Sequence, residues 1–377
     1  MYVHLPFCVS KCRYCDFNSW AWTGQDLARH VDAVLREAEQ RAAGLRPQTV
    51  FLGGGTPTLL PPAELARLLD GLHEVSGFRD TARETTLEAN PESLDAETAA
   101  AAREHGADRV SIGVQSLRSE VLSAYDRAHD PGEALAAFAT ARDAGFARVN
   151  LDLIFAFPGQ DPAAWRADLA RVLELGPEHL SCYELSFEPG TALTRLRDAG
   201  RFPPADEAEL RLELFESTRA QCAAAGLERY EVSNFARPGE ACLHNLAYWR
   251  NLDYVGIGAG AGSWRHGVRS RNLASPEAYE AALAGGEDPA EERETPDART
   301  AAFDCLMMGL RLEHEGVSLA RVERVAGADP FRLWPRELEQ ALADGLLEHD
   351  GDRLRATPAG FVLLDSVLER LLPGTPV

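Results

Sequence analysis

The stretch that decides the fold class is YVHLPFCVSKCRYCDFN, residues 2–18. Its three cysteines, Cys8, Cys12 and Cys15, have the spacing C-x3-C-x2-C, so one short loop can direct three thiolates at one object. A four-iron cluster held by three thiolates keeps one iron open to a small molecule, whereas a structural zinc site needs four protein ligands. The pattern favours a 4Fe-4S cluster. A zinc knuckle that lacks its fourth ligand and three unrelated thiols are the alternatives.

Length, composition and charge indicate a cytoplasmic protein with two domains. The 377 residues exceed one typical domain, and a hydrophobic content of 45% is enough for two cores. A net charge of -21, with Lys11 as the single lysine, argues against a nucleic-acid binder, because neutralising phosphates needs surplus basic charge. The sequence has no apolar run long enough to span a bilayer and opens on a strand-like segment, so we expect neither a transmembrane segment nor a leader.

Short apolar runs alternate with longer stretches of helical period in the first half of the chain. The expected strands are Tyr2–Leu5, Thr49–Leu52, Thr85–Ala89, Arg109–Val114, Arg148–Phe155 and Leu180–Leu185. The expected helices, each opened by Pro or Asp, are Asp26–Ala43, Pro62–Leu72, Asp95–His105, Pro131–Ala144 and Pro162–Leu175. This α/β alternation predicts an open, partial (β/α)6 barrel of parallel strands, with the chemistry at the carboxyl ends of the strands. The cysteine loop follows the first strand, as this rule requires.

Glycines and a carboxylate follow the second and third expected strands. The second strand ends in GGGTPT, residues 53–58, where three glycines in a row let backbone groups approach a ligand. A plain tight turn before the helix start at Pro61 and Pro62 is the alternative. Glu88, at the end of the third strand, is expected to direct a carboxylate into the strand-end mouth, where it could accept hydrogen bonds from ribose hydroxyls. Capping of the helix that follows is the ordinary interpretation of the neighbouring Asn90, and it is compatible with this role of Glu88.

Three further polar residues, Gln115, Arg127 and Asp152, lie on or after the fourth and fifth strands. Any one of them could be an ordinary ion-pair or capping residue. Their positions on or after successive strands favour a shared cavity instead.

Taken together, these segments resemble the radical S-adenosylmethionine (SAM) enzymes, and among them the branch of the oxygen-independent coproporphyrinogen III oxidases and the HemW haem chaperones. The resemblance spans residues 2 to about 364. It implies that the three cysteines hold a 4Fe-4S cluster whose open iron is chelated by the amino and carboxylate groups of SAM. It implies SAM contacts at Tyr2, Gly54 and Glu88. The family cavity, which includes a second SAM site in the oxidase, is matched here by Gly55, Thr56, Gln115, Arg127 and Asp152.

Two positions depart from the family pattern. Asp126, before Arg127, and Ala156, at the end of the strand that holds Asp152, stand where the family usually has glycine. They leave open the local loop geometry and the presence of a second SAM site.

Three features separate the two branches of the family. The oxidase has a further cysteine where this chain has Phe17, and it has a long N-terminal extension, whereas only seven residues precede the first cysteine here. The third feature is CLHNLAYWR, residues 242–250, which contains H-N-x-x-Y-W, a motif associated with HemW and its haem binding. His244 is therefore a candidate iron ligand, and Tyr248 and Trp249 are candidates to cover a porphyrin face. The alternative is a structural histidine beside core aromatic residues.

The remaining segments complete the expected organisation. Residues 254–263 are glycine-rich without a Rossmann strand before them, which favours a tight return of the chain against the barrel over a dinucleotide site. A helix, a hairpin and a helix, which resemble the winged-helix-like C-terminal domain of the family, are predicted over 337–346, 349–356 and 357–372. The expected domains are a barrel, a connecting segment with the HNxxYW motif, and the C-terminal domain, over 1–235, 236–290 and 291–377.

The expected function is that of a cytoplasmic haem chaperone that passes haem to an acceptor protein, with 4Fe-4S cluster and SAM as cofactors and the cluster in a supportive or redox-linked role. An electron donor is a further partner if SAM is cleaved. The alternative is a radical enzyme that decarboxylates coproporphyrinogen III through a 5'-deoxyadenosyl radical. A third hypothesis is a regulatory binding protein that uses the C-terminal domain, but the acidity of that domain offers no basic stripe for DNA.

Overall fold

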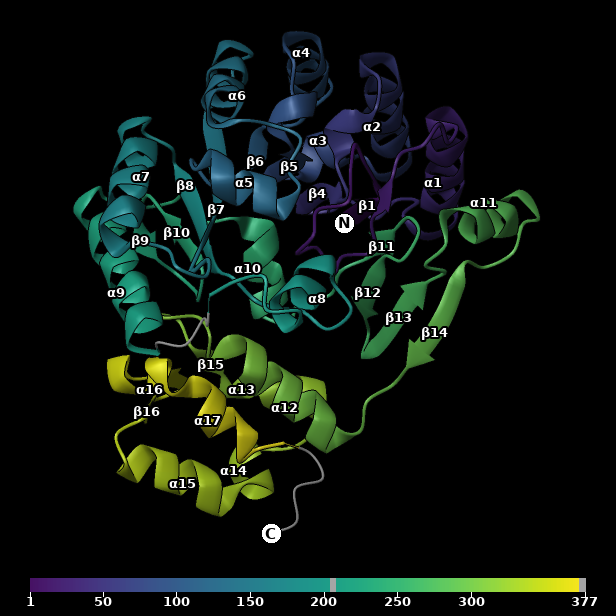
Figure 1. The fold of residues 1–377 in the computed structure, drawn as a ribbon. Helices are drawn as coiled ribbons and strands as arrows, with labels where there is room; N and C mark the ends of the chain where they lie inside the picture. The colour runs from purple at the N-terminus through teal and green to yellow at the C-terminus, as the bar shows by residue number, and fades with distance from the viewer. Residues whose placement is uncertain (204–207, 373–377) are drawn as a thin grey trace.

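A computed structural model describes residues 1–203 and 208–372, and its centre is one curved sheet (Figure 1). Six parallel strands form the middle of this sheet: β1 (Tyr2–Leu5), β4 (Thr49–Gly54), β5 (Glu84–Ala89), β6 (Arg109–Gln115), β7 (Arg148–Phe155) and β8 (His179–Glu184). The prediction of six strands in this order is confirmed. The sheet continues beyond the predicted barrel, with β11 (Gly256–Ile257) beside β1, and with β10 (Asn234–Ala236) and β9 (Glu228–Arg229) beyond β8.

Helices cover the outer face of the sheet (Figure 1). They are α1 (Leu27–Arg41), α2 (Pro62–Ser76), α4 (Ala96–Glu104), α6 (Pro131–Asp143), α7 (Pro162–Glu174) and α9 (Ala208–Ala224). An Asp side chain caps four of the five predicted helices: Asp26, for example, accepts from the backbone N–H of Arg29, and Asp95 from that of Thr98, whereas α2 has no side-chain cap. None of the helices in the described residues is long and apolar enough to cross a membrane.

The two faces of the sheet differ in polarity because successive side chains of a strand alternate between them. Apolar residues such as Leu52 and Leu87 face the helices and are fully buried in the main core. The opposite, inner face of the sheet carries polar residues, among them Glu88, Asn150 and Asp152. The barrel interior is therefore a polar lumen rather than an apolar core.

The glycine-rich segment does more than return the chain, because its β11 pairs in parallel with β1 and extends the sheet. A separate antiparallel sheet follows, made of β12 (Gly262–Arg265), β13 (Val268–Asn272) and β14 (Ala290–Glu294), with α11 (Pro276–Ala284) between the last two strands. The expected domain border at 235 falls inside β10, and the border at 290 falls at the first residue of β14. β10 pairs with β8 and β14 pairs with β13, so both borders cut through sheets.

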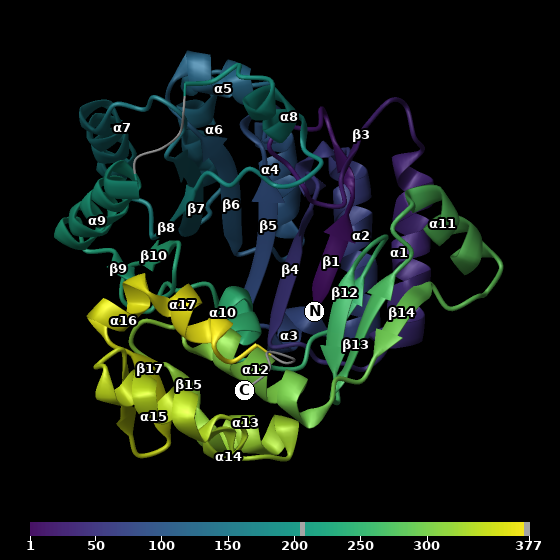
Figure 2. The same cartoon turned by 60° about the horizontal axis from the view of Figure 1, so that its bottom comes forward.

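The C-terminal part forms a second core beneath the barrel (Figure 2). Its elements are α12 (Ala298–Gly309), β15 (Val317–Ser318), α13 (Leu319–Ala326), α14 (Pro330–Leu333), α15 (Pro335–Ala343), β16 (Leu347–Asp350), β17 (Arg353–Ala356), α16 (Pro358–Val362) and α17 (Leu364–Glu369). The predicted helix, hairpin and helix are present, but the last helix is wrong as one element, because it breaks at Leu363. Residues 373–377 of the expected domain lie outside the described residues.

Candidate functional site

The three-cysteine loop closes on itself over the carboxyl end of β1. Cys8 ends β2 (Phe7–Cys8), which pairs in parallel with β3 (Trp20–Ala21), and the Cys8 carbonyl accepts from the Trp22 N–H at 2.7 Å. The N–H of Cys15 donates to the carbonyl of Cys12 at 3.2 Å. All three thiols are free and partly buried. They therefore share one compact loop, as the spacing predicts.

A cation, the Arg127 guanidinium, lies beside the cysteine loop. Burial raises the pKa of Cys8 to about 11, the Thr56 side chain and the Arg127 guanidinium act against this rise, and the Cys12 and Cys15 thiols add to it. Arg127 Nη1 donates to Cys12 Sγ at 3.4 Å. Within the described residues, no three His, Cys, Asp or Glu side chains converge on one metal ion. The donor set is three thiols on one loop beside a cation, which fits an anionic iron-sulfur cluster with one iron open.

Arg127 joins the ends of neighbouring strands to the cysteine loop. Its Nη2 donates to Asn90 Oδ1 and to the Gly113 carbonyl, each at 2.7 Å, and Asn90 Nδ2 donates to Thr56 Oγ1 at 2.8 Å. Asn90 occupies the N-cap position of the 3-10 helix Pro91–Ser93, but its side chain makes no capping bond there and instead bridges Thr56 to Arg127. The buried Nε of Arg127 has no partner among the described residues. A donor is thus left over beside the cluster loop.

The glycine run is required by packing within the protein. A Cβ at Gly53 would lie 2.5 Å from Glu88 Oε2, and a Cβ at Gly55 would lie 2.6 Å from the Leu5 carbonyl oxygen. Gly54 has φ +100°, and a Cβ there would overlap the His4 ring. The three glycines let the end of β4 lie against β1 and the cysteine loop. Neither the plain-turn alternative nor ligand approach alone explains the run.

Two carboxylates face the lumen below the cysteine loop. Glu88 Oε2 accepts from the Gly54 N–H at 3.0 Å, and burial, with the Asp152 charge nearby, raises the pKa of Glu88 to about 7. Asp152 accepts from Asn150 Nδ2 at 2.8 Å and from Ser111 Oγ at 3.2 Å, and burial raises its pKa as well. The two predicted residues therefore share one lumen, where the Asp152 charge disfavours ionisation of Glu88.

Both departures from the family glycines keep a glycine-like backbone. Asp126 has φ +61° and Ala156 has φ +63°, in the left-handed region that favours glycine. Gln115 has φ +65° and pairs with Leu153 of β7 just after a register shift between Gly113 and Gln115. The loops at the mouth thus hold the conformation that glycine would adopt, at some cost in strain.

Tyr2 lies deeper in the lumen than the other predicted SAM contacts. A hydrogen bond of 2.8 Å joins its hydroxyl to His4 Nδ1, and His4 Nε2 is bonded to the Asn18 carbonyl of the cysteine loop at 2.9 Å. The Tyr2 ring is stacked near His244, with centroids 6.4 Å apart. Sequence reasoning missed His4 and Asn18 as parts of this network, although the period of two places His4 on the same face of β1 as Tyr2.

The HNxxYW motif forms α10 (Leu243–Trp249), which closes the amino end of the barrel (Figure 2). Glu84, at the start of β5, accepts from the N–H groups of Leu243 and His244 at 3.0 and 2.9 Å. His244 is 1% exposed, its Nδ1 is bonded to Thr49 Oγ1 at 2.8 Å, and its Nε2 to Tyr248 Oη at 2.9 Å. Both nitrogens of His244 are therefore occupied in this arrangement.

Tyr248 and Trp249 lie at the end of α10 and are partly buried. The Tyr248 ring meets the Tyr254 ring edge to face, with centroids 4.6 Å apart. The predicted site residues thus form two groups, with Tyr2 between them, because its ring lies beside that of His244. The three cysteines, the mouth residues and the lumen carboxylates lie toward the carboxyl end of the strands, and the haem candidates lie at the amino end.

Comparisons with known proteins agree with this geometry. Residues 2–172 match the radical SAM superfamily, and residues 297–363 match the HemN C-terminal domain. Coproporphyrinogen III oxidase (HemN) from Escherichia coli has the same fold, with a TM-score of 0.82 over 98% of this chain and 89% of that chain at 24% identity.

Proteins named heme chaperone HemW match along nearly their whole length. Identity is 38% with the protein of Mycobacterium tuberculosis, over 99% of this chain and 94% of the relative. It is 35% with that of Escherichia coli, over 99% and 97%, and 32% with that of Bacillus subtilis, over 98% and 98%. Radical SAM proteins carry a 4Fe-4S cluster and SAM, and the thiol loop with its neighbouring cation fits them. The chain belongs to the HemW family of the radical SAM superfamily.

Proposed function

We propose that this chain is a haem chaperone, which binds haem and passes it to an acceptor protein. The observation that carries the proposal is full-length similarity to proteins named heme chaperone HemW in three bacteria. Phe17, in place of the further cysteine of the oxidase, supports the chaperone over coproporphyrinogen III decarboxylation.

The cluster and SAM are assigned to the carboxyl end of the barrel. Cys8, Cys12 and Cys15 are the proposed iron ligands, and SAM at the open iron supplies a sulfonium bond that one electron can cleave. The proposed SAM-binding residues are Tyr2, Gly54, Gly55, Thr56, Glu88, Gln115, Arg127 and Asp152. In this assignment Glu88 accepts hydrogen bonds from the ligand, and the unpartnered Nε of Arg127 is a donor beside the cluster.

Haem is assigned to the side of the barrel that carries the HNxxYW motif. Because both nitrogens of His244 are bonded and buried, ligation of iron by His244 requires α10 to move. A role that needs no movement is to hold the Tyr248 hydroxyl and so orient the Tyr248 ring. We favour this positioning role for His244, with Tyr248 and Trp249 as the aromatic contacts.

The proposed place of action is the cytoplasm, where thiols stay reduced. All seven cysteines of the chain are free in the structure, which is compatible with that compartment. The proposed partners are haem and the acceptor, with an electron donor added where SAM is cleaved.

The test uses anaerobically reconstituted protein in two parallel reactions. One receives haem, and the other receives coproporphyrinogen III, SAM and a reductant. We expect stable haem binding, followed by transfer to an added apo-haemoprotein, and no decarboxylated product. Formation of the decarboxylated porphyrinogen, or failure to retain haem, contradicts the proposal.

A further inference from the structure

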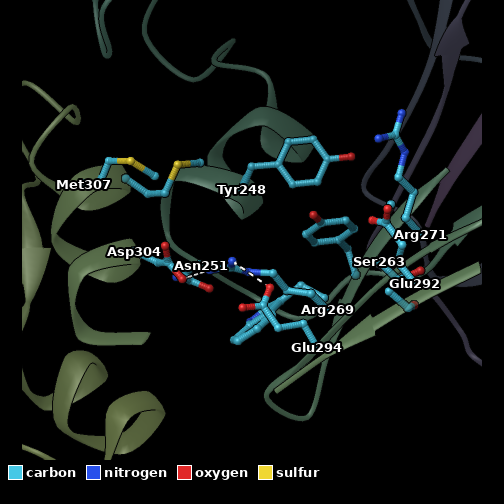
Figure 3. A pocket seen from close by; sticks show the side chains of 14 residues that line it. Tyr248, Asn251, Ser263, Arg269, Arg271, Glu292, Glu294, Asp304 and Met307 are labelled. Atoms are coloured by element: carbon cyan, nitrogen blue, oxygen red, sulfur yellow. Dashed lines mark hydrogen bonds and ion pairs between the residues drawn. The ribbon is translucent and has the colours of Figure 1, made fainter. Parts of the chain in front are cut away.

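A cleft lies between the sheet of β12, β13 and β14 and helix α12 of the C-terminal part (Figure 3). Its volume is about 440 Å³, in the range of cofactor pockets. The Tyr248 ring of the HNxxYW motif forms part of its wall. The cleft is therefore a direct neighbour of the proposed haem motif and lies outside the barrel lumen.

Strand register decides which side chains of the sheet face the cleft. Trp264 is paired with Arg269 and Arg269 with Glu294, so these three share one face. Gly262, Arg271 and Glu292 form the next row on the same face. A Cβ at Gly262 would meet nothing within 4 Å, so this row opens onto free space.

The charges of the cleft leave one cation available. Arg269 is paired with Asp304 and lies 3.4 Å from Glu294. Arg271, two residues further along β13, makes no ion pair or hydrogen bond in the part of the chain that the structure describes. An unpaired arginine at the edge of an aromatic cleft suits a planar ligand with an acidic edge.

The opposite wall supplies soft donors. The chain has three methionines, and two of them, Met307 and Met308, line the cleft from α12. In Figure 3 Met307 lies across the cleft from Arg271, with Tyr248 between them along one wall. A thioether is one of the side-chain groups that ligate haem iron, and flat aromatic rings suit a porphyrin face.

We infer that this cleft is the haem seat. The porphyrin lies against the ring of Tyr248, a propionate is paired with Arg271, and a thioether of α12 faces the iron, while Arg269 covers the buried Trp264 ring. The inference rests on the proposed function, because haem is the ligand it assumes. It keeps Tyr248 of the HNxxYW motif as an aromatic contact, held by His244, but it gives no contact to Trp249, which does not line the cleft.

The decisive experiment titrates haem into full-length protein and variants and records absorption spectra. Gly262→Trp fills the cleft from a position with open space, and we expect at least about tenfold weaker binding. Gly262→Ala is the matched control and retains wild-type affinity. The double variant Met307→Leu with Met308→Leu keeps the volume of α12 and removes both thioethers, so the spectrum of bound haem changes.

Charge variants give a second test of haem affinity, in which one substitution should weaken binding and another should strengthen it without disturbing the packing. We expect Arg271→Glu to weaken haem binding about fivefold, and Glu292→Gln, which removes a carboxylate from the same row, to strengthen it. Arg293→Gln, on the opposite face of β14, leaves the affinity unchanged. Wild-type affinity in both Gly262→Trp and Arg271→Glu, or a wild-type spectrum in the double methionine variant, overturns the inference. If wild-type protein itself takes up no haem, the proposed function fails instead.

Discussion

Strand β5 carries a glutamate at each end, and the two are used in opposite ways. Glu84, at the amino end, is fully buried and satisfied: it pairs with Arg148 at 2.8 Å and accepts from the N–H groups of Leu243 and His244. Glu88, at the carboxyl end, accepts one described hydrogen bond, and its pKa is raised to about 7. The barrel is closed by matched polar groups at its floor, and its mouth is left with unmatched ones, as a ligand site requires.

The largest expected effect concerns the cluster, because three thiolates share one loop at the mouth. Cys12→Ala should abolish stable 4Fe-4S incorporation, since two remaining thiolates do not hold the cluster. Iron and sulfide content after anaerobic reconstitution is the measurement. Cys305→Ala, a buried thiol in α12, is the control and should keep full content. A normal iron content in the Cys12→Ala protein rules out the ligand assignment.

The next prediction compares the amino end of the barrel with its carboxyl end by making the same Glu→Gln substitution at Glu84 and at Glu88 of β5. Glu84→Gln breaks a buried, hydrogen-bonded ion pair and should lower the free energy of unfolding by about 3 to 5 kcal/mol. Glu88→Gln should be neutral or stabilising at pH 8. The pKa of Glu88 is higher in the folded state than in the unfolded state, so wild-type stability falls as pH rises from about 4.5 to about 7.

Urea unfolding of the cluster-free protein at pH 5 and pH 8 tests this pair. The free-energy difference between Glu88→Gln and wild type should shift in favour of the variant at the higher pH. Equal losses of unfolding free energy from both substitutions would contradict the prediction, because they would show that Glu84 and Glu88 stabilise the fold to the same extent.

A third prediction concerns SAM. Glu88→Ala should weaken SAM binding by about 1 to 3 kcal/mol, because hydrogen bonds to a charged or polar acceptor are lost. Equilibrium binding to the reconstituted protein is the measurement, and Glu97→Ala, an exposed carboxylate of α4, is the control. Gly54→Val is a poorer probe, since its side chain would overlap His4. Unchanged SAM affinity in Glu88→Ala places the site elsewhere.

A fourth prediction tests the role of His244 at the floor. His244→Ala should lower haem affinity about fivefold, because Tyr248 loses the hydrogen bond that holds its ring. Added imidazole should not restore the wild-type haem spectrum, and Tyr248→Phe should lower the affinity to a similar extent. Restoration of the wild-type spectrum by imidazole would identify His244 as an iron ligand.

The smallest effect is expected from relief of strain at the mouth. Asp126→Gly and Ala156→Gly should each change stability by about 0.4 to 1 kcal/mol, in the stabilising direction, because glycine adopts a φ near +60° without steric cost. The urea midpoint is the measurement. Gly145→Ala, at φ +88° in a turn with free space, is the reciprocal control and should destabilise.

Sequence reasoning succeeded where the signal is local. The six strands were predicted to within two residues at each end, since short apolar runs mark the strands and Asp or Pro residues mark the starts of the helices between them. It missed the bridging role of Asn90, the His4–Asn18 link and the pairing of β11 with β1. These depend on contacts such as the one between Asn18 and Ala259, residues that are far apart in the chain.

The sequence by itself determined the barrel and the cysteine loop, because spacing and periodicity act over a few residues and are written along the chain. The family followed from the resemblance of its motifs to those of known proteins. Tertiary structure decided what the HNxxYW motif touches. Thr49 meets His244 across 195 positions of sequence, and this contact occupies a nitrogen that the motif alone leaves free. It also decided that the glycine run serves packing against His4 and Glu88. Such assignments require side chains from distant segments to share one volume, which no local pattern specifies.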